Sequence, residues 1–135
     1  MAFTGIPREL AEWVDSMHLS PYALIGALVV VYLVLGTALD GISMVVLTMG
    51  VIMPTVTAAG IDPVWFGIFI VLVVEMAQIT PPVGFNLFVL QGMTGRDLLY
   101  IARVTLPMFI LMIAAVLLIY FVPGIVTWLP QHMTM

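Results

Sequence analysis

The nine residues QITPPVGFN, at positions 78–86, separate two strongly apolar runs. Proline inside a helix removes a backbone hydrogen bond and clashes with the preceding turn, so two prolines followed by a glycine predict a break. The apolar runs before and after the break are each short for a membrane crossing, which needs about 20 residues. Together they are long enough to span. The sequence therefore predicts a discontinuous transmembrane helix over residues 62–93.

The composition indicates a membrane protein. Of the 135 residues, 64% are hydrophobic and 7% are charged, with a mean hydropathy of +1.28, whereas soluble domains carry about 25% charged residues. Cysteine and lysine are absent from the sequence, which excludes disulfides, thiol chemistry and a P-loop ATPase. The sequence has no basic patch for nucleic acid and no catalytic constellation, so we expect neither an enzyme nor a cofactor. We predict an all-α polytopic membrane protein.

Two elements are predicted before the broken helix. Residues 7–18 predict an amphipathic helix with Trp13 on its apolar side, which lies in the membrane interface or packs on a partner protein. Residues 20–59 predict a helical hairpin. Its start is marked by Ser20 followed by Pro21, and the turn LDGIS separates its two apolar runs.

One long element is predicted after the broken helix. Residues 97–122 predict the last transmembrane helix, with Pro107 inside it as a tolerated kink. The spacing of Thr94 and Asp97 predicts a capping box at its start. The tail after residue 122 contains two prolines and a tryptophan and predicts an exit through the membrane interface.

The broken backbone itself is a candidate binding site. Non-helical backbone at membrane depth is tolerated only where protein buries it or a water-filled cavity receives it. The two prolines offer no N–H, so the carbonyls near Ala77 and Gln78 are free to coordinate a cation. The first amides of the half-helix from Gly84 point back into the break and favour a carboxylate. Thr80 and Asn86 flank the break and either supply ligands or cap the half-helices.

The hairpin turn offers the second half of a possible site. Gly36, Thr37 and Ser43 supply hydroxyls and close backbone approach. Asp40 is a functional carboxylate, a helix cap or a residue in a wet loop. Glu75 lies within an apolar run, where a carboxylate is either functional or else paired or protonated inside the bundle.

Several motifs occur in the order and spacing of a known family. They are FTGIPREL, LGTALDGIS, AAGIDPVWFGIFIVL and EMAQITPPVGFNLFVLQG. Over nearly its whole length the chain resembles the C-terminal part of the large membrane subunit of tripartite ATP-independent periplasmic (TRAP) transporters. The resemblance implies a multi-pass permease component in the bacterial inner membrane. It also implies sodium-driven secondary transport of carboxylates such as C4-dicarboxylates.

The same resemblance implies partners and an ion site. Family members work with a small membrane subunit and a periplasmic substrate-binding protein, and their large subunit has an N-terminal repeat. Their hairpin, matched here by residues 20–57, is re-entrant, and sodium is held largely by backbone carbonyls, here near Gly36, Ala77 and Thr80. Sodium is the coupling ion, and no cofactor is implied. The candidate ion- or substrate-binding residues are Gly36, Thr37, Asp40, Ser43, Ala77, Gln78, Thr80, Pro81, Gly84 and Asn86.

The chain also departs from the family's pattern. Gly50, Val73 and Ala77 stand where the family often has proline, asparagine and glycine, which affects the bend of the hairpin's second arm and any polar role before Glu75. The family's first repeat has no counterpart here. We therefore expect that the chain does not transport alone and is a fragment, a split-gene product or a remnant.

Two other functions stay open on the sequence. A small, non-transporting structural subunit of a membrane complex could have this composition, but it gains little from a helix break that a carrier needs. A related anion or citrate carrier of the same wider group could have such a break.

Overall fold

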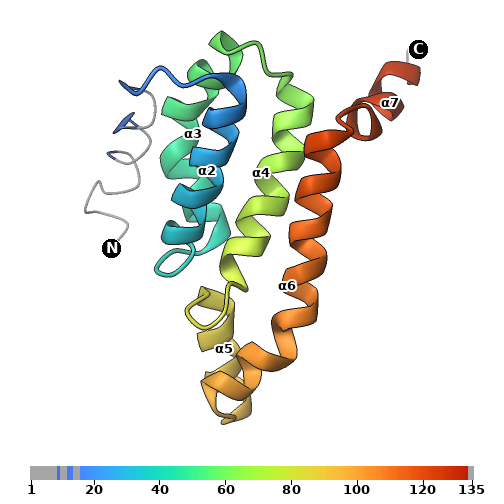
Figure 1. Cartoon of the computed structure of the whole chain (residues 1–135). Helices are drawn as coiled ribbons and strands as arrows, with labels where there is room; N and C mark the ends of the chain where they lie inside the picture. The colour runs from blue at the N-terminus through green and yellow to red at the C-terminus, as the bar shows by residue number, and fades with distance from the viewer. Residues whose placement is uncertain (1–8, 10–11, 14–15, 134–135) are drawn as a thin grey trace.

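The computed structural model describes residues 9, 12–13 and 16–133. Every regular element among these residues is a helix, which confirms the all-α prediction for the described part of the chain (Figure 1). The predicted interfacial helix over 7–18 lies mostly outside the described residues. The helices are α2 Pro21–Leu35, α3 Gly41–Ala58, α4 Pro63–Gln78, α5 Phe85–Thr94, α6 Leu98–Phe121 and α7 Gly124–His132.

Helix α4 lies at the centre of the structure. Helices α2 and α3 lie on one side of it and α6 lies on the other, while α5 follows its lower end (Figure 1). The indole N–H of Trp65 in α4 donates to the carbonyl of Ile119 in α6 at 2.9 Å. The hydroxyls of Tyr32 and Thr48 join α2 to α3. Polar bonds therefore fix the neighbours of α4 in an otherwise apolar core.

Local side chains set the helix starts that the sequence marks. The hydroxyl of Ser20 accepts a hydrogen bond from the amide of Ala23 at 3.4 Å, which caps α2. The carboxylate of Asp62 accepts from the amides of Val64 and Trp65 at 2.8 and 2.9 Å, which caps α4. These caps satisfy amides that have no partner inside their own helix.

The predicted capping box of Thr94 and Asp97 is wrong. Thr94 is the last residue of α5, and its hydroxyl donates to the carbonyl of Leu90 at 2.7 Å. Gly95 follows with a left-handed φ of 64°, so α5 ends directly after Thr94. Asp97 alone caps α6, accepting from the amide of Leu99 at 3.1 Å.

The tail forms a short helix that the sequence does not predict. Pro123 precedes the first residue of α7, a position where a missing N–H leaves nothing unpaired. Pro130 lies near the end of this helix. Helix α6 runs through Pro107 without ending, as the sequence predicts.

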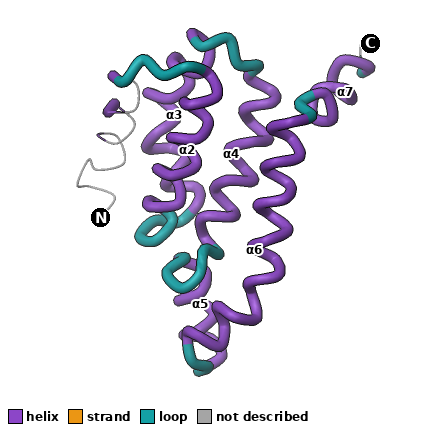
Figure 2. Tube along the Cα trace, viewed as in Figure 1, coloured by secondary structure: helices purple, strands orange, loops and turns teal. Residues whose placement is uncertain are grey.

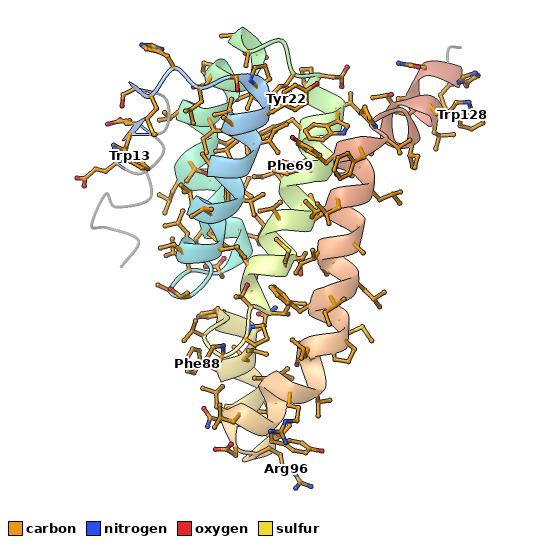
Figure 3. All side chains as sticks on the ribbon, viewed as in Figure 1. Trp13, Tyr22, Phe69, Phe88, Arg96 and Trp128 are labelled. Atoms are coloured by element: carbon orange, nitrogen blue, oxygen red, sulfur yellow. The ribbon has the colours of Figure 1, made fainter. Side chains whose placement is uncertain are left out.

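Among the described residues, two helices, α3 and α6, are long and apolar enough to cross a membrane. Helices α2 and α4 are apolar but shorter, and at 15 and 16 residues they rise only about 22–24 Å, against a hydrocarbon thickness of about 30 Å. Side chains along α6 point outward from the helices (Figure 3), and many of them are large, apolar and exposed. This face suits hydrocarbon or another apolar protein surface.

Candidate functional site at the helix break

The break leaves the last carbonyls of α4 short of donors. The carbonyls of Ala77 and Gln78 would normally bond the amides four residues on, but those positions are Pro81 and Pro82. The amide of Thr80 makes a long bond to the Ala77 carbonyl at 3.4 Å, and the amide of Ile79 is shared between the carbonyls of Ala77 and Met76. No donor among the described residues bonds the Gln78 backbone carbonyl. The end of α4 therefore presents backbone oxygens to the break.

Gly84 closes the backbone tightly over this end. It is buried, and its amide donates to the carbonyl of Thr80 at 2.8 Å. A Cβ at position 84 would overlap the carbonyl oxygen of Gln78 and would lie 2.8 Å from the amide nitrogen of Thr80. Only glycine lets the chain fold back this closely.

The hairpin turn between α2 and α3 packs against the break (Figure 2). The carbonyl of Gly36, just after α2, accepts a hydrogen bond from the amide of Phe85, the first residue of α5, at 3.0 Å. A Cβ on Gly36 would lie 2.6 Å from the Cβ of Ala77 and 2.8 Å from its carbonyl oxygen. The two segments that the sequence suggests as halves of one site therefore touch through backbone atoms.

Protein carbonyls already bond most of the amides at the start of α5. The amide of Gly84 bonds Thr80, and the amide of Phe85 bonds Gly36. The amide of Asn86 has no acceptor among the described residues, and the Asn86 side chain is half-buried. The anion-binding end predicted from the sequence is thus reduced to one amide.

The two threonine hydroxyls bond their own preceding turns. Thr80 donates to the carbonyl of Met76 at 2.9 Å, and Thr37 donates to the carbonyl of Val34 at 2.8 Å. These are local bonds of the kind that cap a helix end. Each hydroxyl oxygen keeps acceptor lone pairs after donating its proton. Thr80, which lies directly at the break, can therefore still serve as an oxygen ligand.

Asp40 is the N-cap of α3. Its carboxylate accepts from the amide of Ser43 at 3.0 Å and from the hydroxyl of Ser43 at 2.6 Å. The carboxylate also lines a groove of about 450 Å³ between α3 and α4, together with Glu75 and Gln78. Glu75 is exposed there rather than paired inside the described bundle. The sequence alone does not bring these three residues together, because they come from two helices.

Comparison with protein families matches residues 1–125 to the DctM component of tripartite ATP-independent periplasmic transporters. The chain belongs to this family. The resemblance inferred from the TPPVGFNLF region is thereby confirmed, and a related anion or citrate carrier outside the TRAP family is set aside. TRAP permeases are transport proteins and not enzymes, and the two helices long enough to cross a membrane fit a membrane component.

Curated relatives match almost the whole chain. It is 31% identical over 130 residues to the C4-dicarboxylate TRAP transporter large permease protein DctM of Pseudomonas aeruginosa, over 96% of the chain and 30% of that protein. It is 33% identical over 135 residues to the DctM of Rhodobacter capsulatus, over 100% of the chain and 31% of that protein. It is 33% identical over 122 residues to the ectoine TRAP transporter large permease protein TeaC of Halomonas elongata, over 90% of the chain and 29% of that protein. No solved structure matches the chain.

The relatives are much longer than this chain. The chain spans about 30% of each of the relatives that it matches. The hairpin and the broken helix described above therefore correspond to one part of a larger protein in this family.

Proposed function

We propose that this chain is part of the large permease of a sodium-driven secondary transporter for carboxylates such as C4-dicarboxylates. The permease is a multi-pass protein of the bacterial inner membrane and works with a small membrane subunit and a periplasmic substrate-binding protein. Family membership supports the transport role. Two of the relatives named above are C4-dicarboxylate permeases and the third is an ectoine permease, which supports an organic solute as the cargo.

The observation that carries the ion proposal is the surplus of backbone oxygens at the break. The Gln78 carbonyl has no described donor, and the Ala77 carbonyl is reached only by the Ile79 amide, which it shares with Met76, and by a long bond from the Thr80 amide. Unwound backbone carbonyls in discontinuous helices coordinate sodium in secondary transporters. We assign these two carbonyls and the hydroxyl oxygen of Thr80 to the coupling sodium ion. The carbonyl of Gly36, held against α5, completes the oxygen-rich side of the site.

The carboxylate substrate is assigned to the other side of the break. The start of α5 has the positive end of its helix dipole there, and the Asn86 amide is unbonded within the described chain. The Asn86 side chain adds an amide that can donate to a carboxylate oxygen. Ion and substrate then share one break, which couples their binding.

A non-transporting structural subunit is the competing function. In hydrocarbon each backbone group without a hydrogen-bond partner costs several kcal/mol. A structural subunit gains nothing that offsets this cost, so a continuous helix would suit it better. The Gln78 carbonyl has no donor in the described chain and lies directly against Gly84, and this unwound backbone supports the carrier.

The test uses the complete transporter in proteoliposomes, with the small subunit and the binding protein supplied and uptake of a labelled C4-dicarboxylate measured against sodium concentration. Gly84→Ala places a methyl group on the Gln78 carbonyl and is expected to abolish sodium-dependent uptake while the protein still inserts. Gly92→Ala in α5 is the matched control, because a Cβ there meets no described atom within 4 Å. Normal sodium dependence in Gly84→Ala rejects the ion assignment.

A further inference from the structure

A groove between α3 and α4 has an acidic end and apolar walls. Its polar residues are Asp40, Glu75 and Gln78. Its apolar walls are formed by Ile42, Val45, Val46, Val71 and Val74. Several wall residues are widely open, and Val46 is 71% exposed. The groove thus offers an open apolar surface with polar groups at one end.

The side chain of Gln78 is a buried amide without a partner. Gln78 is only 8% exposed, and its side chain makes no hydrogen bond within the described chain. Among the described residues, every side-chain nitrogen or oxygen that lacks a hydrogen bond is at least partly accessible. The unbonded amide of Gln78 is therefore accessible, and the space that it lines is the groove. Its nitrogen lies against the backbone of Gly41, another wall residue. The amide therefore offers a hydrogen bond to whatever fills the groove.

The carboxylates of the groove lack a cation in the described chain. Glu75 forms no hydrogen bond or ion pair there, and the Asp40 carboxylate is bonded by Ser43 and by backbone amides around the start of α3, not by a cation. Arg96 lies at the connection between α5 and α6 (Figure 3), where its guanidinium stacks over Tyr100. The length of α5, about 15 Å for its ten residues, separates that connection from the break. An ionisable side chain at membrane depth is costly unless it pairs.

We propose that this groove seats a transmembrane helix from another part of the large permease subunit, and that this helix carries an arginine or lysine that pairs with Glu75 and Asp40 and bonds Gln78. The relatives are about three times as long as the matched region, so most of the large subunit lies outside that region and can supply such a helix. The apolar walls suit a membrane helix, and the acidic end selects a basic side chain. This inference rests on family membership and not on the sodium site.

A photo-crosslinking experiment on the complete transporter in membranes tests the occupant. Benzoylphenylalanine replaces Val46 in the groove wall or, as the control, Val104 on the exposed face of α6. The expected adduct from position 46 is a peptide of the same large subunit, outside this chain, that comes from an apolar helix with an arginine or lysine. The control is expected not to capture that peptide. A lipid adduct, a small-subunit peptide, a second copy of the chain or no protein adduct overturns the proposal.

A second measurement tests the ion pair. Glu75→Gln and neutralisation of the captured basic residue are each expected to lower the thermal stability of the purified complex. The double variant is expected to lose less than the sum of the two losses, because the partners share one interaction. Additive losses refute the pairing. The crosslink at position 46 is read without reference to sodium, and the sodium dependence of Gly84→Ala is read without the crosslink, so failure of the sodium proposal and failure of this one are distinguishable.

Discussion

Replacing Gly36 with alanine is expected to push the hairpin turn away from the break. The new Cβ would lie 2.6 Å from the Cβ of Ala77, and 2.7 and 2.8 Å from its carbonyl carbon and oxygen. Unbonded carbon atoms prefer about 3.5–4.0 Å, so the turn must shift by about 1 Å. Overpacking of this kind costs about 1–3 kcal/mol. The shift also strains the bond from the Phe85 amide to the Gly36 carbonyl, which contributes about 1 kcal/mol.

The total of about 2–4 kcal/mol corresponds to a factor of about 30 or more in any equilibrium that needs turn and break together. We expect the sodium concentration for half-maximal uptake in proteoliposomes to rise by a factor of that order. Gly67→Ala in α4 is the control, since a Cβ there meets no described atom within 4 Å. A double variant, Gly36→Ala with Ala77→Gly, is expected to stay defective, because the backbone carbon and oxygen of residue 77 remain in the way.

The outcome that refutes this reasoning is specific. If Gly36→Ala and Gly67→Ala show the same sodium dependence and the same thermal unfolding, the contact between turn and break contributes neither to sodium binding nor to stability. If instead Ala77→Gly restores wild-type behaviour, the side chain of Ala77 and not its backbone limits the approach. In the first case the carbonyl of Gly36 would lose its place in the ion site.

The remaining predictions concern stability and are measured by thermal unfolding of the complete purified transporter. Asp40→Ala is expected to cost about 1 kcal/mol more than Asp40→Asn, because asparagine removes the charge but keeps an oxygen for Ser43 and so keeps the α3 cap; equal losses contradict the cap role. Thr48→Val is expected to destabilise more than Tyr32→Phe, because it leaves a buried tyrosine hydroxyl unpaired at a cost of about 1–3 kcal/mol. In Tyr32→Phe the hydroxyl of Thr48 keeps its bond to the Met44 carbonyl at 2.7 Å, so the reverse order would disprove this pairing scheme.

Local chemistry explains which parts of this fold could be predicted from the sequence. The start of α4 follows from Asp62 and Pro63, because one residue caps free amides and the next needs no amide partner. The end of α4 follows from Pro81 and Pro82, which cannot donate. The position of the break, and with it the candidate residues on either side, could therefore be predicted from residue type and spacing alone.

Contacts between distant segments explain what could not be predicted. The hydrogen bond from the Phe85 amide to the Gly36 carbonyl joins the start of α5 to the turn after α2. No local sequence pattern predicts a contact between residues so far apart in the chain. The acidic groove is another case, since Glu75 belongs to α4 and Asp40 to the start of α3. The predicted capping box is wrong for a local reason: Gly95 takes a left-handed conformation, so α5 ends at Thr94.

Because the break is made with prolines rather than glycines, its backbone has more free acceptors than free donors. A break made of two glycines would leave carbonyls and amides unpaired in equal number and would attract cations and anions alike. Pro81 and Pro82 remove two donors but keep their acceptors upstream, at Ala77 and Gln78. The turn then uses its own carbonyl at Gly36 to occupy one more amide, that of Phe85. Both features leave more backbone acceptors than donors at the break, which supports the proposed sodium site before any side chain is considered.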